Sequence, residues 1–254
     1  MSFHAKKSYG QHFLIQYKII EKIANLIIGT GFKNVLEVGP GKAALTRSLL
    51  GKFENFLAVE ADRDMYEYLI GEFIKEKDCF IHADFLKLKL DLFFNNEDFL
   101  ICGNFPYNIS SQIVFKAIDN YHRVPMLIGM FQKEMAQRII SKPGAKDYGI
   151  ISAITSLYYS GRIEFDIGPG NFFPPPKVNS SLLILKKNNL FLTETEQKKV
   201  RSLIKIAFQH RRKTLRNNFK STISPALLED KYFDQRPEDI SPLEYLRLSK
   251  ELIS

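Results

Sequence analysis

The chain has 254 residues, of which 45% are hydrophobic, so it is long enough for one large cored domain with a small second one, and its composition excludes a disordered protein. No apolar run reaches the roughly 18 residues of a membrane-spanning helix, and the first residues lack the apolar core of a signal peptide, so we expect a cytoplasmic protein without membrane contact. The formal net charge is +8, which favours a polyanionic partner if the positive residues are concentrated in one place.

Short apolar strands alternate with helical stretches over the first part of the chain. The first predicted strand, 35–39, ends in a glycine, and helices are predicted at 62–75 and 110–118. This alternation is typical of a parallel sheet with helices on both faces. Two more strand candidates, at 162–168 and 178–186, are close enough in sequence to form an antiparallel pair. The remaining strands are predicted at 56–61, 79–82, 98–103 and 124–131.

The pattern changes after about residue 187. Thr193 and Glu196 fit a capping box, and apolar residues follow at helical spacing. We therefore predict two domains, 1–187 and 188–254, of which the second is small and all-helical. Nine Lys or Arg residues and no acidic residue lie between Lys198 and Lys220. The segment favours binding to a polyanion, although charge alone is also consistent with an ordinary solvated helix face.

The two cysteines, Cys79 and Cys102, fall in strand-like apolar runs. They are too few for a disulfide framework or a zinc site, so we expect two reduced core thiols and no bound metal.

A glycine-containing turn, Gly39-Pro40-Gly41, follows the first predicted strand. Glycines there let the backbone approach a ligand closely, and the next helix offers free N–H groups. By itself the motif fits a tight strand–helix turn as well as a cofactor loop, because the dinucleotide fingerprint needs a third small residue. Position 43, where such a loop would carry another glycine, is Ala43.

Carboxylates at the ends of the next two strands favour the cofactor interpretation. Glu60 closes the second strand, where a carboxylate can accept both ribose hydroxyls of a nucleoside cofactor. Asp84 follows the third strand, where it can accept from an adenine amino group while neighbouring backbone completes the ring edge. These residues do not distinguish a dinucleotide from S-adenosylmethionine.

The fourth strand ends in Asn104-Phe105-Pro106-Tyr107. An adenine amino nitrogen is a poor nucleophile because its lone pair is delocalised into the ring, and two acceptors at its hydrogens would localise and aim that pair. The Asn104 side-chain oxygen and a carbonyl beside Pro106 can serve as these acceptors, and Tyr107 offers a face on which the base can stack. Asn104 is neutral, so we expect it to position the amine and stabilise developing charge rather than act as a general base.

These motifs resemble those of the ribosomal RNA adenine dimethyltransferases along nearly the whole chain. The Asn-x-Pro-Tyr element at 104–107, followed by Phe-x-Pro-x-Lys-Val at 173–178, is highly specific to that family. The resemblance implies an α/β fold, a Rossmann-like class I methyltransferase with a seven-stranded mostly parallel sheet and a small all-helical C-terminal domain. It implies S-adenosylmethionine as the methyl donor. The other matching segments are 10–14, 132–134, 148–149 and 211–213.

The reaction that the resemblance implies converts two adjacent adenosines near the 3′ end of small-subunit rRNA to N6-dimethyladenosines. The partner would be the immature small ribosomal subunit, and we expect a monomer. Two alternatives stay open: a sister enzyme that modifies large-subunit rRNA and confers antibiotic resistance, and a non-catalytic nucleic-acid-binding factor on the same fold. A small-molecule methyltransferase would not explain the basic segment.

The resemblance also implies roles for single residues. Tyr107 and Phe173 would sandwich the flipped adenine, and Gln11 would contact the methionine end of the cofactor. His12 stands where the family often has asparagine, so we expect a main-chain contact rather than imidazole chemistry; a methyl group at Ala43 should not abolish binding. The implied sets are Asn104, Pro106, Tyr107 and Phe173 for catalysis, Gln11, His12, Leu14, Gly39, Gly41, Glu60, Asp84, Phe85 and Asn104 for the cofactor, and Arg211, Arg212, Lys213 and Arg216 for RNA.

Overall fold

The computed structural model describes residues 11–252, and its contacts divide the chain into two compact units. The first comprises the chain up to Ala136 together with Arg162–Lys187, and the second comprises Gln137–Gly161 and the chain from Asn188 onward. Gly10, which begins the N-terminal motif, lies outside the described residues. Among the described residues, no helix is long and apolar enough to cross a membrane.

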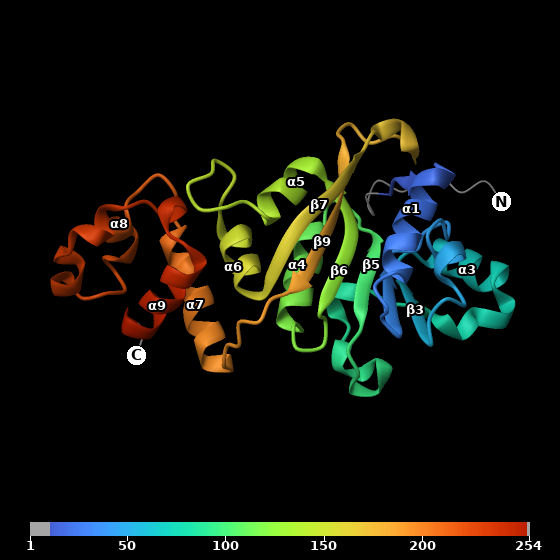
Figure 1. Ribbon diagram of the computed structural model, residues 1–254, viewed down its shortest axis with the longest axis horizontal. Coiled ribbons are helices and arrows are strands. Elements are labelled where there is room, and N and C mark those ends of the chain that lie inside the picture. The colour runs from blue at the N-terminus through green and yellow to red at the C-terminus, as the bar shows by residue number, and fades with distance from the viewer. Residues whose placement is uncertain (1–10, 253–254) are drawn as a thin grey trace. The chain divides into compact units, whose positions relative to one another are not determined.

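A seven-stranded sheet forms the centre of the first unit, in the order β4-β3-β2-β5-β6-β9-β7 (Figure 1). The pairs from β4 to β6 are parallel, and β9 runs antiparallel to β6. The sheet confirms the expected mostly parallel, Rossmann-like fold, and each strand predicted from the sequence is present with small shifts at its ends. The strands are β2 (Asn34–Val38), β3 (Asn55–Glu60), β4 (Phe80–His82), β5 (Leu100–Asn104), β6 (Met126–Gln132), β7 (Tyr159–Ile167) and β9 (Ser180–Lys187).

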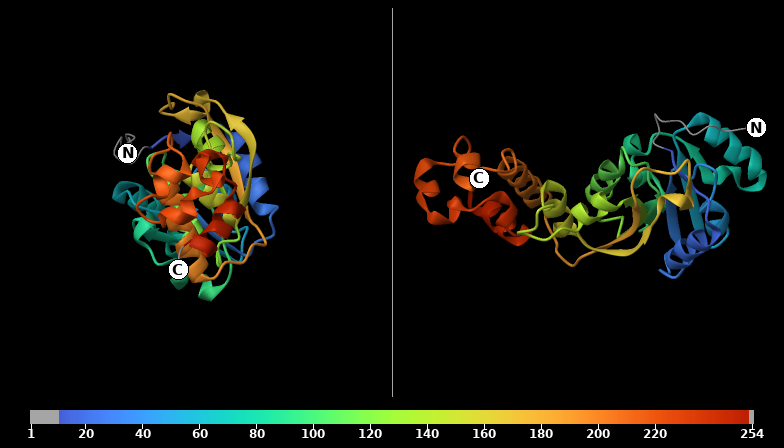
Figure 2. Two further views of the ribbon diagram at one scale, coloured as in Figure 1. Left: turned by 90° about the vertical axis from the view of Figure 1, so that its left-hand side faces the viewer. Right: turned by 90° about the horizontal axis from the view of Figure 1, so that it is seen from above.

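Helices cover both faces of this sheet (Figures 1 and 2). The N-terminal helix α1 (Tyr17–Ile28) buries Ile23 and Ile27 in the core, as their helical spacing predicts. Burial of such a stripe, at about 25 cal/mol per Å² of apolar surface, is what holds a helix of this length on a sheet. The other helices that begin in this unit are α2 (Thr46–Leu49), α3 (Arg63–Glu72), α4 (Ser110–Asp119) and α5 (Lys133–Ile139).

A short two-stranded ribbon joins the N-terminal motif to the proline-rich loop. β1 (Phe13–Leu14) pairs antiparallel with β8 (Phe172–Phe173), so that Phe13 lies opposite Phe173 and Leu14 opposite Phe172. The sequence does not predict this ribbon, because strands of two residues have no recognisable periodicity. The ribbon brings together two segments of the family motif that are far apart in the chain.

The second unit is helical. Its helices α6 (Ile150–Tyr158), α7 (Glu194–Ala207) and α9 (Pro242–Leu252) pack on one another, and the short helix α8 (Leu215–Phe219) packs on α7. α6 belongs to this unit although the sequence analysis placed it in the domain 1–187. The physical reason is that α6 is buried almost throughout its length, and α7 and α9 supply part of the surface that buries it.

The predicted capping box starts α7. The Thr193 hydroxyl accepts from the N–H of Glu196, and the Glu196 carboxylate accepts from the N–H of Thr193. Both N–H groups would otherwise lack an intrahelical partner, so the pair sets where the helix begins.

Candidate active site

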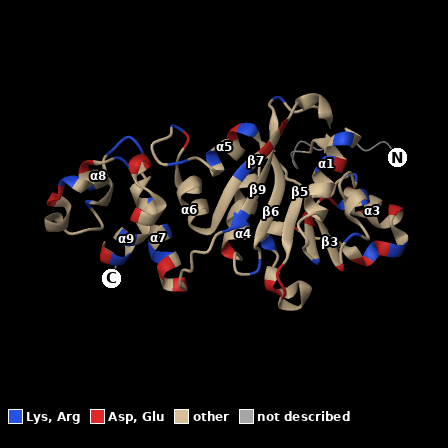
Figure 3. Ribbon diagram, viewed as in Figure 1, with Lys and Arg blue, Asp and Glu red and all other residues tan. Residues whose placement is uncertain are grey.

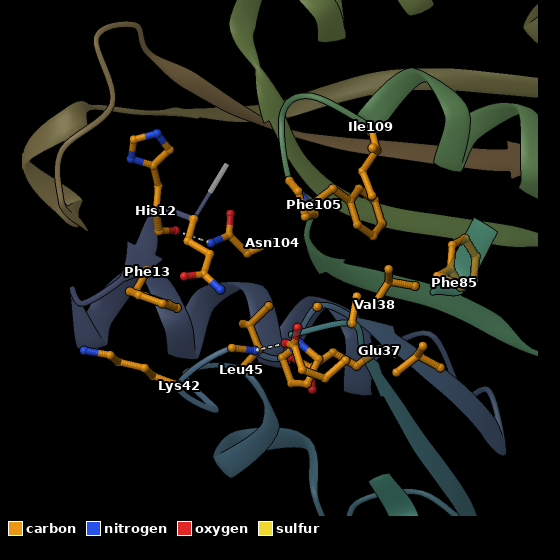
Figure 4. A pocket seen from close by; sticks show the side chains of 18 of the residues that line it. His12, Phe13, Glu37, Val38, Lys42, Leu45, Phe85, Asn104, Phe105 and Ile109 are labelled. Carbon is orange, nitrogen blue, oxygen red and sulfur yellow. Dashed lines mark hydrogen bonds between the residues drawn. The ribbon is translucent and has the colours of Figure 1, made fainter. Parts of the chain in front are cut away.

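A cavity of about 520 Å³ lies at the carboxyl ends of β2, β3, β4 and β5 (Figure 4). Its volume is typical of a small-molecule site, and its place at the edge of a mostly parallel sheet is where such folds bind ligands. Every residue predicted to contact the cofactor lines this cavity, as do Pro106 and Tyr107. The contacts themselves stay predictions.

The glycine-containing turn adopts the backbone that its sequence predicts. Gly39 has φ +70° and Gly41 has φ +53°, the left-handed region that glycine enters without strain. A Cβ at Gly41 would lie 2.9 Å from Cε1 of Phe13, so glycine also permits the close approach of that ring. Ala43 has φ +63° and is fully buried. An alanine in this conformation costs about 1–2 kcal/mol, which explains why a glycine would suit the position.

Glu60 holds this turn in place. Its Oε2 accepts from the N–H of Gly41 at 3.0 Å, and its Oε1 accepts from the N–H of Asp62 at 2.9 Å. The side chain is buried, and burial raises the pKa of Glu60 while the N–H groups of Asp62, Gly41 and Ala61 oppose that shift. Each oxygen keeps a second lone pair for a ligand hydroxyl. Glu60 therefore anchors the cavity wall as well as offering the predicted acceptor.

Two further carboxylates line the cavity. Asp84 caps the short turn that begins at Phe85, since its Oδ1 accepts from the N–H of Leu86 at 3.0 Å. Glu37, to which the sequence analysis assigned no role, is buried beneath the turn and accepts from the Thr46 hydroxyl at 2.8 Å. Burial raises the pKa of Glu37 to about 8, and the nearby charge of Glu60 adds to the shift. The position of Glu37 within the first predicted strand, just before the glycine turn, is the sequence feature that could have indicated this residue.

Asn104 is held with its acceptor oxygen unused. Its Nδ2 donates to the main-chain carbonyl of His12 at 2.6 Å. Because a carbonyl can only accept, this bond dictates the orientation of the amide and directs Oδ1 elsewhere, and no other described residue donates to that oxygen. The His12 carbonyl therefore binds Asn104 in this structure, and the predicted main-chain contact of His12 with the cofactor stays a prediction.

Tyr107 is fixed at both its hydroxyl and its ring. The hydroxyl lies 2.6 Å from the Ser180 Oγ, and the His12 imidazole stacks on the ring with centroids 5.4 Å apart and an interplanar angle of 27°. The His12 Nδ1 lies 2.7 Å from the Pro174 carbonyl and therefore donates to it. Burial raises the pKa of Tyr107, so its hydroxyl stays protonated. The sequence predicts a main-chain contact for His12 rather than imidazole chemistry, whereas in the structure the imidazole stacks on the predicted base platform.

Two other predicted residues show no contact of the predicted kind. Phe173 is 60% exposed and does not line the cavity, although its ribbon partner Phe13 does. Gln11 lines the cavity, but its amide donates to Asp62 at 2.9 Å. The sandwich of an adenine between Tyr107 and Phe173 stays a prediction.

The four residues predicted to contact RNA differ in their surroundings. Arg216 pairs with Asp234 at 2.7 Å and also donates to the Leu228 carbonyl, and Arg211 donates to the Lys146 carbonyl. Arg212 and Lys213 are exposed, and neither side chain has a hydrogen bond or ion pair to another described residue. Arg211 and Arg216 therefore form hydrogen bonds within the second unit, because acceptors that are distant in the sequence lie beside them in the fold.

The sheet order and the cavity at its carboxyl edge give the fold of the class I methyltransferases. The chain is similar to the solved structures of a dimethyladenosine transferase from Plasmodium falciparum (TM-score 0.77, 24% identity, 94% of this chain and 97% of that one) and the 23S rRNA methyltransferase ErmE (TM-score 0.68, 22% identity, 95% and 100%). At these identities the likeness shows the fold. The family model for ribosomal RNA adenine dimethylase matches residues 2–253. The chain belongs to the ribosomal RNA adenine dimethylase family.

Relatives named ribosomal RNA small subunit methyltransferase A match over almost the full length. The protein of that name from Flavobacterium johnsoniae is 42% identical over 98% of this chain and 95% of its own, and the one from Porphyromonas gingivalis is 38% identical over 98% of each.

Proposed function

We propose that this protein transfers methyl groups from S-adenosylmethionine to the N6 amino groups of two adjacent adenosines near the 3′ end of small-subunit rRNA, acting in the cytoplasm as a monomer on the immature subunit. The observation that carries the proposal is the Asn104 amide, whose Nδ2 is held by His12 while its oxygen is left to accept. The names of the relatives support the small subunit over the large one, since the likeness to ErmE extends only to the fold.

The cavity residues fit this cofactor. Glu60 keeps acceptor capacity for ribose hydroxyls, and Asp84 lines the same cavity and offers a carboxylate to an adenine amino group. The turn Gly39–Gly41 lets the backbone approach the rest of the cofactor closely. When bound, the cofactor supplies an electrophilic methyl group on a positively charged sulfur.

The residues of the chain make the amine reactive. The Asn104 Oδ1 and the carbonyl beside Pro106 accept from the two amino hydrogens, which withdraws the lone pair from the ring and aims it at the methyl group. The same acceptors stabilise the positive charge that develops on nitrogen. Asn104 has no basic atom, so the proton lost after each transfer leaves to solvent.

One experiment tests this function. Purified protein is incubated with methyl-labelled cofactor and unmethylated small subunits, with large subunits in parallel, and the labelled nucleotides are mapped. We expect N6-dimethyladenosine in small-subunit rRNA. Label in the large subunit alone would favour the sister enzyme, and RNA binding without any transfer would favour a non-catalytic factor.

Removal of either predicted stacking ring should reduce turnover on RNA. Base–aromatic stacking is worth about 1–3 kcal/mol per base, so we expect Tyr107→Ala and Phe173→Ala to lower kcat/KM for RNA by about that free energy while cofactor affinity changes less. Steady-state kinetics at subsaturating RNA and calorimetric cofactor titration measure both quantities. Tyr17→Ala, which removes an exposed aromatic ring of α1, is the matched control. A wild-type rate in either test variant excludes that ring from the sandwich.

The basic segment should bind the rRNA backbone. Figure 3 shows positive residues on α7 and on the loop before α8. We expect Arg212→Gln with Lys213→Gln to weaken RNA binding and to reduce the salt slope by roughly one unit or slightly less for each lost phosphate contact. Arg211 and Arg216 are left intact because they bond within the unit.

The measurement is RNA affinity over a series of salt concentrations, with cofactor affinity expected to stay the same. The pair Lys75→Gln and Lys77→Gln removes the same charge from another exposed segment and serves as the control. A salt slope equal to that of the wild type would show that Arg212 and Lys213 contact no phosphate and belong to an ordinary solvated surface.

A further inference from the structure

Phe105 attaches the catalytic loop, Asn104–Tyr107, to the sheet. Its ring is 1% exposed, whereas Asn104, Pro106 and Tyr107 are each partly exposed. The ring makes an edge-to-face contact with Phe131 of β6, with centroids 5.2 Å apart. The Phe105 ring and the Asn104 side chain point away from each other (Figure 4), as successive residues of an extended chain do. The Phe105 ring is thus buried against β6 while the Asn104 side chain points the other way, and both residues line the cavity.

Two glycines make the space that this ring fills, which we call the glycine slot. Gly103 of β5 and Gly129 of β6 are partners in the sheet register, so they lie side by side on one face. A Cβ at Gly129 would lie 2.0 Å from Cε2 of Phe105. A Cβ at Gly103 would lie 2.4 Å from the Val38 carbonyl oxygen and 3.1 Å from Cε1 of Phe105. Carbon atoms in contact are normally about 3.5–4.0 Å apart. Any side chain at position 129 therefore excludes the ring from its observed place.

We propose that Gly129 is a positioning residue for methyl transfer. Its missing side chain seats the Phe105 ring, and the seated ring sets the direction of the adjacent Asn104 amide and of the main chain beside Pro106. The proposal rests on the proposed function, because these are the groups that would hold the adenine amine. Gly129 itself lies outside the cavity lining. Displacement by about 1 Å in such a constellation costs about 10²-fold in rate.

The loop has a second attachment that the slot does not touch. The Tyr107 hydroxyl is bonded to Ser180 of β9, so a side chain at position 129 should displace Asn104 more than Tyr107. Base stacking should then survive while the alignment of the amine is lost. The expected signature is a lower kcat with little change in the KM for RNA.

The test is a double-mutant cycle on the full chain. We expect Gly129→Ala to lower kcat by about 10- to 100-fold, with the KM for RNA unchanged. Phe105→Leu alone should lower kcat because the slot is left partly empty. Combined with Gly129→Ala, the shorter side chain makes room for the new Cβ, so kcat should rise above that of Gly129→Ala. Two independent losses of stability would not produce this opposite-signed coupling, and comparison of kcat with the unfolding midpoints separates it from a shared effect on stability.

Ile128→Val, a buried neighbour in β6 outside the slot, controls for destabilisation, and thermal unfolding is recorded for every variant. If Gly129→Ala does not fold, the double variant is compared with Phe105→Leu: equal or higher activity supports the slot, and a further loss overturns it. A wild-type kcat in folded Gly129→Ala, or purely additive losses, would also overturn the proposal. Absence of adenine dimethylation by the wild-type protein would instead overturn the proposed function, and the positioning role with it.

Discussion

Replacement of Asn104 by alanine should reduce methyl transfer by about 10²–10³-fold, the usual cost of removing one preorganised polar contact at a reacting centre. The variant loses the acceptor for the adenine amine and also the bond that Nδ2 donates to the His12 carbonyl. RNA binding should stay almost normal, because the basic segment is untouched. Single-turnover transfer of labelled methyl groups to unmethylated subunits measures the loss. Asn108→Ala, an exposed asparagine that lines the same cavity, is the matched control.

The Asn104→Asp variant separates the two roles of the amide. Aspartate keeps an acceptor oxygen, but it cannot donate to His12, and its charge near the sulfonium favours the ground state of the cofactor over the transition state. We expect activity between that of alanine and wild type, with more monomethyladenosine, because a monomethylated amine has one N–H left to be held. Mass spectrometry of digested rRNA measures the ratio. Wild-type rates with full dimethylation in the alanine variant would refute the mechanism.

The second large effect is expected for Glu60→Ala, which should weaken S-adenosylmethionine binding. A hydrogen bond to a charged group is worth about 1.5–3 kcal/mol, which corresponds to about tenfold or more in Kd. The structure adds a second reason, since the N–H groups of Gly41 and Asp62 lose their acceptor and the turn loosens. Glu60→Gln should lie between alanine and wild type, because only one of its side-chain atoms can accept.

Calorimetric titration measures the cofactor Kd of these variants, and thermal unfolding without cofactor reports the loosened turn. Glu67→Ala removes an exposed carboxylate of α3 and is the control. An unchanged cofactor Kd in Glu60→Ala would show that Glu60 does not contribute to cofactor binding. A weaker Kd with an unchanged midpoint of unfolding would assign the whole effect to the ligand contact.

Much of the site followed from local pattern, because parallel strands place their carboxyl ends on one edge. Glu60, Asp84 and Asn104 each close or follow a predicted strand, and all three line one cavity. The small β1–β8 ribbon did not follow in this way. Its pairing of Phe13 with Phe173 joins segments that no periodicity links, and the stacking of His12 on Tyr107 depends on that ribbon.

The amino-acid sequence was sufficient for the alternation of strands and helices, for the polar residues at the strand ends that line the cavity, and for the family. All of these reside in short segments whose residue types and spacing carry the information. Tertiary structure alone showed that Arg216 pairs with Asp234, that α6 packs with α7 and α9, and that Gly103 and Gly129 leave room for Phe105. Each of these depends on which surfaces of distant segments meet. Such a meeting is set by packing volume and charge in three dimensions, and neither leaves a period along the chain.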